Sequence, residues 1–184
     1  MKKHWLFGSI VLALLTVFSG TSGCADKKEA PPAVERTGPL KVYSYERKGF
    51  DMSEKIVKTD MEWKKLLTPV QFHVLREKGT EPAGSGKLLN NHEHGVYRCA
   101  ACGLDLYRSA DKYESGTGWP SFTAPIAPEN IATAADNSLF SRRTEVLCRR
   151  CNGHLGHVFE DGPRPTGLRY CMNSAALVFA AGKD

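Results

Sequence analysis

The chain has 184 residues, of which 24% are charged, and a formal net charge of +5 at pH 7. After a removable leader is subtracted, the remaining length suits one domain with its own hydrophobic core, and it excludes a large multidomain assembly. Two of the positive charges, Lys2 and Lys3, lie in that leader, so the rest is too mildly basic to indicate a nucleic-acid partner.

The N-terminal residues have the pattern of an export signal. A basic start over residues 1–4 precedes an apolar run over residues 5–18 and a stretch of small residues before Cys24. The apolar run is too short to span a bilayer comfortably. We therefore predict a signal peptide over residues 1–23 and a bacterial protein that is exported to the periplasm or cell envelope.

The end of this leader resembles a lipoprotein signal. Thr21-Ser22-Gly23-Cys24 is similar to a lipobox, in which Cys24 would become the acylated N-terminus and anchor the protein to a membrane. Lipoboxes usually have leucine where this chain has Thr21, so an unlipidated leader and an uncleaved anchor stay open as alternatives. Residues 24–52 are rich in charged residues and proline and poor in large apolar residues, and we predict a flexible tether there, followed by a folded domain over residues 53–184.

Two short helices are predicted at the start of this domain. Thr59 and Glu62 fit a capping box, as do Thr68 and Gln71, and Gly79 is placed where a helix usually stops. Pro69 both ends the first helix and suits the first position of the second. The residues expected to give the second helix its apolar packing side are Val70, Val74 and Leu75.

After Gly79 the pattern changes to short runs with turn residues between them. No helix-length segment alternates with these runs, which argues against a parallel α/β sheet. We therefore predict a mainly β (α+β) fold with antiparallel sheets and short N-terminal helices. The predicted strands are residues 96–99, 104–107, 139–141, 144–147, 156–159 and 175–180.

Two CxxC units predict a metal site. Cys99 and Cys102 form one unit, Cys148 and Cys151 form the other, and each follows a predicted strand. A tight turn at such a position presents two thiolates to one ion, and four thiolates make a closed tetrahedral Zn²⁺ site.

Two alternatives to zinc follow from the same cysteines. An exported protein meets an oxidising compartment, so the pairs also fit disulfides or a redox couple, although a redox CxxC normally opens a helix in a βαβ unit. A zinc ribbon that binds nucleic acid through Arg149 and Arg150 is the other alternative, and the mild charge and the export signal count against it.

Cys171 is the cysteine of the predicted domain that lies outside the two CxxC units, which makes it the candidate nucleophile. A nearby cation such as Arg169 would favour the thiolate, and Asn173 is placed to orient a substrate. The alternative is a buried cysteine that acts as a small hydrophobe at the start of an apolar run.

Two histidines and a tryptophan complete the candidate site. His154 and His157 directly follow the second CxxC unit, and if four thiolates satisfy the metal, both are free for proton transfer near neutral pH. Trp119 lies in a glycine-rich turn over residues 115–122. The alternatives are histidines that only support a turn and a core tryptophan beneath a loop.

Taken together these segments resemble the methionine-R-sulfoxide reductase (MsrB) family, from near Thr59 to Ala175. The five motifs that carry the resemblance are Gly79-Thr80-Glu81-Pro82, Tyr97-Arg98-Cys99-Ala100-Ala101-Cys102-Gly103, Gly116-Thr117-Gly118-Trp119-Pro120-Ser121-Phe122, His154-Leu155-Gly156-His157-Val158-Phe159 and Asn173-Ser174-Ala175. They occur in the family's order and cover most of the chain after the leader.

The resemblance implies two antiparallel sheets, one structural zinc ion on the four CxxC cysteines, and Cys171 as the nucleophile. The implied reaction reduces methionine-R-sulfoxide, free or in proteins and peptides, and leaves methionine and a sulfenic acid on Cys171. His154 and His157 are the implied acids, and Trp119 is implied to pack against the substrate methyl group. Asn173 and Arg169 would support the nucleophile.

One position departs from the family pattern. Many members have a cysteine in the glycine-rich turn that resolves the sulfenic acid, and this chain has Thr117 there. We therefore expect a thioredoxin-like or small-thiol reductant to act directly on Cys171. A binding module without turnover and a thiol–disulfide exchange protein remain as alternative functions, and they predict an inert Cys171 and freely titrating CxxC sulfurs, respectively.

Overall fold

The computed structural model describes residues 38–138 and 142–182. The predicted leader, the lipobox and the predicted strand over residues 139–141 lie outside these ranges. Within them, neither α-helix is long and apolar enough to cross a membrane.

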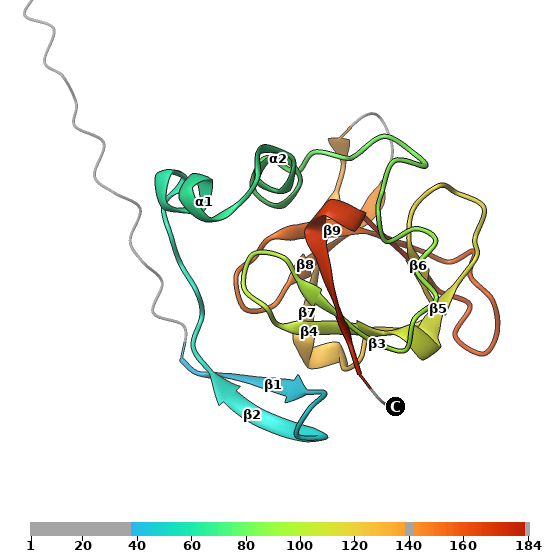
Figure 1. The fold of residues 1–184 in the computed structure, drawn as a ribbon, viewed down its shortest axis with the longest axis horizontal. Coiled ribbons are helices and arrows are strands. Elements are labelled where there is room, and N and C mark those ends of the chain that lie inside the picture. The colour runs from blue at the N-terminus through green and yellow to red at the C-terminus, as the bar shows by residue number, and fades with distance from the viewer. Residues whose placement is uncertain (1–37, 139–141, 183–184) are drawn as a thin grey trace, which may run out of the picture. The chain divides into compact units, whose positions relative to one another are not determined.

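The larger sheet carries the candidate site. It has six antiparallel strands, of which β5 to β9 are labelled in Figure 1. In spatial order the strands are β5 (Lys112–Tyr113), β6 (Ser121–Phe122), β10 (Arg169–Met172), β9 (His154–Phe159), β8 (Arg143–Cys148) and β7 (Ile131–Asp136).

A second antiparallel sheet has three strands, β11 (Leu177–Ala181), β3 (Gly95–Cys99) and β4 (Asp105–Arg108), in that order. Among the described residues, 3₁₀ turns connect strands at η1 (Ser109–Asp111), η2 (Pro128–Asn130) and η4 (Ser174–Ala176). The mainly β, antiparallel architecture with short N-terminal helices is confirmed. The last predicted strand begins later than expected, because residues 174–176 form η4.

A third, two-stranded sheet corrects the predicted tether. β1 (Leu40–Ser44) and β2 (Gly49–Ser53) form an antiparallel hairpin inside the segment that we expected to be flexible. Val42 is buried, and the backbone of Tyr43 exchanges hydrogen bonds of 2.7 and 2.8 Å with the amide side chain of Asn130. The composition of this segment misled the prediction because its ordering partner lies 87 residues away in the chain.

Both predicted helices are present, as α1 (Asp60–Leu66) and α2 (Pro69–Glu77), and both predicted capping boxes are formed. Val74 and Leu75 are buried as expected, and α2 contacts β9 and η4. Val70 was wrongly assigned to the packing side, because its side chain is 58% exposed. The left-handed residue that ends α2 is Lys78, one position before the predicted glycine.

A cluster of buried aromatic side chains packs against β10. The rings of Tyr107 and Phe122 stack with centroids 4.4 Å apart, and Tyr97 meets Phe122 edge-on at 5.0 Å. Tyr107 also donates a hydrogen bond from its buried hydroxyl to Sδ of Met172, at 3.1 Å. Because Met172 follows Cys171 in β10, this core fixes the strand that carries the candidate nucleophile.

Candidate active site and metal centre

The two CxxC units come together where β3 and β8 end. Cys99 is the last residue of β3, Cys148 is the last residue of β8, and each strand runs into a tight turn that carries the second cysteine. One ligand sulfur from each of the four cysteines lies within 4.8 Å of the others. The Sγ atoms of Cys99 and Cys151 are 3.7 Å apart, and those of Cys102 and Cys148 are 3.5 Å apart.

These distances fit a metal ion and do not fit disulfides. Four sulfurs placed tetrahedrally at about 2.3 Å from Zn²⁺ lie roughly 3.8 Å from one another. A disulfide bond would bring two sulfurs to about 2.05 Å. The five cysteines in the described part of the chain are all free, so the cluster is a four-thiolate site of the kind that zinc occupies.

The backbone of the two turns presents the sulfurs as the sequence predicted. Gly103 and Asn152 both have left-handed backbone angles, with φ of 73° and 55°. Their amides donate hydrogen bonds of 2.7 and 2.9 Å to the carbonyls of Cys99 and Cys148. Arg150, which the zinc-ribbon alternative assigned to nucleic acid, instead donates a hydrogen bond to the carbonyl of Cys102 across the cluster.

Cys171 is held in the middle of the six-stranded sheet. It pairs with Ser121 on β6 and with His157 on β9, so these three side chains share one face of the sheet. Gly156 has no side chain for a physical reason, because a Cβ atom there would collide with the backbone carbonyl of Cys171. Cys171 is partly exposed, which separates it from the buried structural cysteine of the alternative interpretation.

Four of the predicted site residues line one pocket of about 120 Å³. They are Cys171, His157, Trp119 and Asn173, which come from segments that are far apart in the sequence. Arg143, Phe159 and Thr80 also line the pocket and were not predicted. Arg143 was not identified from the sequence because it is one of two adjacent arginines, Arg142 and Arg143, with no motif around them.

His157 is oriented by a carboxylate that the sequence did not reveal. Its Nε2 lies 2.8 Å from Oδ2 of Asp136, and the same oxygen accepts a hydrogen bond of 2.7 Å from Arg143. Hydrogen bonds from Ser138, and then from His157, hold the pKa of Asp136 well below its usual range. The ionised carboxylate therefore binds Nε2–H and leaves the other ring nitrogen of His157 for the pocket.

His154 lies behind His157 and is nearly inaccessible. Its Nδ1 is 2.8 Å from Oε1 of Glu145, whose other oxygen accepts from Lys78, and its ring centroid is 5.3 Å from that of His157. Burial lowers the pKa of His154, and the hydrogen bond to Glu145 only partly offsets this effect. The lowered pKa keeps the imidazole neutral at pH 7. Nε2 of His154 is buried without a hydrogen-bond partner among the described residues.

Glu81 joins two walls of the pocket and was missed as a site residue. Its carboxylate accepts hydrogen bonds of 2.5 and 2.8 Å from the amides of Ser174 and Ala175, which directly follow Asn173. Its own amide donates to Oδ1 of Asn173, and its carbonyl accepts from Nε1 of Trp119, both at 3.1 Å. Its place in the motif Gly79-Thr80-Glu81-Pro82 is the signal that could have pointed to it, although its partners lie 38 and 92 residues away.

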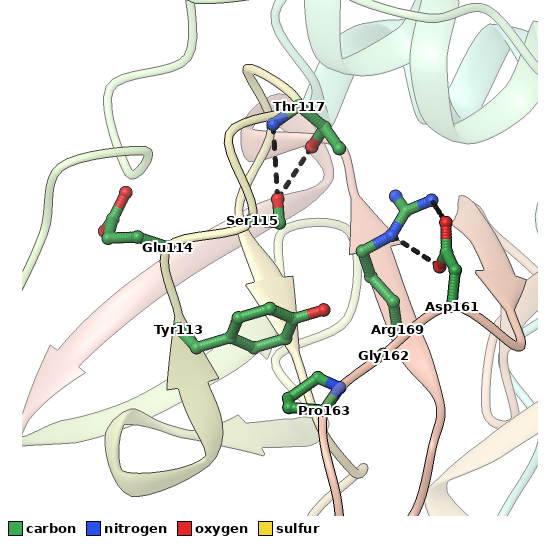
Figure 2. A pocket seen from close by; sticks show the side chains of 8 residues that line it. All are labelled: Tyr113, Glu114, Ser115, Thr117, Asp161, Gly162, Pro163 and Arg169. Atoms are coloured by element: carbon green, nitrogen blue, oxygen red, sulfur yellow. Dashed lines mark hydrogen bonds and ion pairs between the residues drawn. The ribbon is translucent and has the colours of Figure 1, made fainter.

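Arg169 does not line this pocket, although it is two residues before Cys171 on β10 and its charge interacts with that sulfur. It forms a two-bond ion pair with Asp161, at 2.7 and 2.8 Å, and its guanidinium lies 4.4 Å from the ring centroid of Phe159. Figure 2 shows it lining a second hollow of about 400 Å³ with Tyr113, Ser115 and other residues. The expected cation beside Cys171 is thus already engaged by a carboxylate.

The antiparallel fold, the four-thiolate cluster and the separate cysteine–histidine pocket define the class of SelR domains, whose family model matches residues 67–181. A protein of Methanosarcina mazei named peptide methionine sulfoxide reductase MsrB is 56% identical over 130 residues, which cover 71% of this chain and 93% of that relative.

Two further relatives carry the same name. The protein of Leptospira interrogans is 56% identical over 128 residues, which cover 70% of this chain and 98% of the relative. That of Thiobacillus denitrificans is 52% identical over 128 residues, which cover 70% and 97%, respectively. The chain belongs to the MsrB family.

Proposed function

We propose that the pocket at Cys171 reduces methionine-R-sulfoxide to methionine, with Cys171 as the nucleophile. The observation that carries this proposal is the gathering of Cys171, His157, Trp119 and Asn173 around one pocket. Nucleophilic attack on a sulfoxide sulfur requires a thiolate, an oriented histidine as acid, and an aromatic face that holds the substrate. The printed names of the relatives support the same reaction.

The reaction proceeds in two stages. The Cys171 thiolate attacks the sulfoxide sulfur and forms an S–S bond while a proton is delivered to the oxygen. The hydroxyl then passes from the methionine sulfur to the Cys171 sulfur as the S–O bond and the new S–S bond break, which releases methionine and leaves a sulfenic acid on Cys171. An external thiol then attacks the sulfenic sulfur, releases water and forms a mixed disulfide. A second thiol breaks that disulfide and restores Cys171, so two thiols are oxidised for each sulfoxide reduced.

The pocket residues have separate tasks in the first stage. His157, held through Nε2 by Asp136, delivers the proton to the sulfoxide oxygen. The indole face of Trp119 packs against the methyl group of the substrate. Asn173 shapes the end of β10, because its Oδ1 accepts from the Glu81 amide and its Nδ2 donates to the Leu155 carbonyl.

Zn²⁺ is the ion proposed for the four-cysteine cluster, held by Cys99, Cys102, Cys148 and Cys151. A closed set of four thiolates leaves no open coordination position, so the ion supplies structural stability and takes no part in the reaction. The proposed cellular setting is export through the leader over residues 1–23, with a lipid on Cys24 as the membrane anchor and a thioredoxin-like or small-thiol reductant as the electron donor.

The function is tested by a single turnover with separated epimers. We expect reduced enzyme mixed with one equivalent of the R epimer of a blocked methionine sulfoxide, without reductant, to form one equivalent of methionine and a Cys171 that dimedone labels. The S epimer should give neither product. Mass spectrometry of the peptides should find the four CxxC cysteines unmodified, because the metal shields them.

Absence of methionine with the R epimer would overturn the proposed activity. A disulfide between Cys171 and any of the metal cysteines would instead overturn the external thiol as the agent that resolves the sulfenic acid. The two failures are distinguished in the same experiment, since methionine and the cysteine products are measured separately.

Replacing His157 by glutamine is expected to lower kcat/KM for the R epimer by about 10²-fold, because glutamine keeps a donor toward Asp136 but cannot release a proton. His154→Gln should also slow the reaction, since His154 packs against His157. Initial rates of thiol-dependent reduction measure both effects. His73→Gln is the matched control, because His73 is exposed on α2 and pairs with Glu77. Near-normal rates in folded His157→Gln and His154→Gln proteins would assign proton delivery to another group.

A further inference from the structure

Three hydroxyl groups form a continuous chain that ends on the sulfur of Cys171. Oγ of Ser121 lies 2.7 Å from Oγ of Ser115, which lies 2.9 Å from Oγ1 of Thr117. Oγ1 of Thr117 in turn lies 3.8 Å from Sγ of Cys171, within hydrogen-bond range for sulfur. At its far end, Ser121 also reaches the carbonyl of Trp119 at 3.2 Å.

The ends of this chain are firmly placed. Ser121 is completely buried and pairs with Cys171 across β6 and β10. Ser115 and Thr117 border the second hollow, where Figure 2 shows the two hydrogen bonds between them. The three hydroxyls therefore form a path from the buried Ser121 on β6, through the glycine-rich turn, to the sulfur of Cys171.

The hydrogen bonds among these three hydroxyl groups can run in two opposite directions. Each hydroxyl has one proton to donate and two lone pairs, and Ser115 also accepts from the amide of Thr117 at 3.4 Å. When Cys171 is a thiol, every proton points away from sulfur, from Cys171 through Thr117 and Ser115 to Ser121 and the Trp119 carbonyl. When Cys171 is a thiolate, the three hydroxyl protons point the opposite way, and Thr117 donates to the sulfur.

We propose that the Ser121–Ser115–Thr117 chain stabilises the Cys171 thiolate by reversing the direction of its hydrogen bonds when the sulfur ionises. Donation to an ionised acceptor is stronger than donation between neutral groups, and a chain of aligned hydroxyls polarises each member. Thr117 touches the reacting sulfur, whereas Ser115 and Ser121 are positioning residues that act through it. The proposal rests on Cys171 as the nucleophile and adds a source for its reactivity.

Other charged and titratable groups face Cys171 and set the background for this effect. His157 faces it from β9, Tyr113 from β5, and Arg143 across the pocket. Arg169 and Asp161 form their own ion pair, so the arginine charge near the sulfur is largely compensated. None of these groups is altered by removing the Thr117 hydroxyl, which makes that position the clean test.

The test measures the rate of iodoacetamide alkylation of Cys171 against pH, in the full chain and without substrate, by quantifying the alkylated peptide. Thr117→Val removes the hydroxyl and keeps the shape, and we expect roughly tenfold slower alkylation at pH 7 and a rate profile displaced to higher pH by about one unit. The plateau rate at high pH should stay unchanged, because access to sulfur is preserved. Thr117→Ser should follow the unaltered protein.

A matched control and a double variant separate this role from a structural one. Thr123→Val removes a hydroxyl that donates to the carbonyl of Asp111, outside the chain, and should leave the profile in place. Ser115→Ala should displace the profile in the same direction as Thr117→Val but less. The Ser115→Ala/Thr117→Val double variant should match Thr117→Val alone, because Ser115 acts only through Thr117.

A Thr117→Val profile that coincides with that of the unaltered protein would overturn the proposal, as would additive effects of the two substitutions. Either result leaves the reductase activity standing, because alkylation is measured without sulfoxide. Loss of the activity itself would be seen in the single-turnover experiment instead, so the two proposals fail separately.

Discussion

Replacing Cys171 by serine is expected to abolish reduction of the R epimer, with a loss on the order of 10⁴-fold or more. A serine hydroxyl is almost entirely protonated at neutral pH and is a weak nucleophile toward sulfur. The side chain is similar in size and partly exposed, so β10 and its pairing with His157 should persist. Thiol-dependent reduction of each epimer, measured beside the unaltered protein, gives the effect.

The controls for this variant are its metal content and its thermal unfolding midpoint, and both should match the unaltered protein. A folded Cys171→Ser protein that keeps more than a few per cent of the activity would transfer the chemistry to another thiol. If the unaltered protein also resists iodoacetamide at neutral pH, the binding-module alternative would gain support.

Loss of the metal is expected to unfold the domain. The cluster joins the end of β3, in the three-stranded sheet, to the end of β8, in the six-stranded sheet, so one ion ties the two sheets together. Zinc binding by small four-ligand sites is worth about 10–16 kcal/mol, which is comparable with the whole stability of a typical domain, about 5–15 kcal/mol. Cys99→Ser or Cys151→Ser should therefore release the ion and leave the domain unfolded near room temperature, so that heating produces no cooperative unfolding transition.

The measurements are zinc per chain and circular dichroism during heating, with and without a chelator. Cys171→Ser is the matched control, since it removes a sulfur outside the cluster. A metal-free Cys99→Ser protein that is folded and active would refute the structural role of zinc.

Local signals predicted much of this fold. Both helices were found from their capping boxes, because a cap is complete within four residues of sequence. β7 was missed, because alanines fill half of Ile131–Asp136 and only Ile131 and Thr133 are of the β-branched kind that marks a strand, and pairing with β8 supplies its order instead. The hairpin β1–β2 was missed for a related reason, since Asn130 holds it from a distant part of the chain.

The site divides in the same way. His157, Trp119 and Asn173 were found because each lies in a motif, and Cys171 was found because it lies outside the two CxxC units. The structure brings the four to one pocket. Their supporting groups were not found, because Asp136 and Glu81 become partners only when strands and turns far apart in the sequence meet. The roles of the individual residues stay predictions for the experiments above to test.

Glu81 has a consequence for how the protein distinguishes mirror-image sulfur centres. Glu81 holds Trp119 through its carbonyl, the side chain of Asn173 through its amide, and the turn after Asn173 through its carboxylate, so it ties the two walls of the pocket together. Around a sulfoxide sulfur, the two epimers differ by exchanging the oxygen with the lone pair. In a pocket of fixed width, a methyl group seated on Trp119 and a sulfur facing Cys171 direct the oxygen toward His157 in one configuration and away from it in the other. We therefore expect the stereoselectivity of the reaction to depend on the rigidity of the loop that contains Glu81, which touches neither the sulfoxide oxygen nor the thiol.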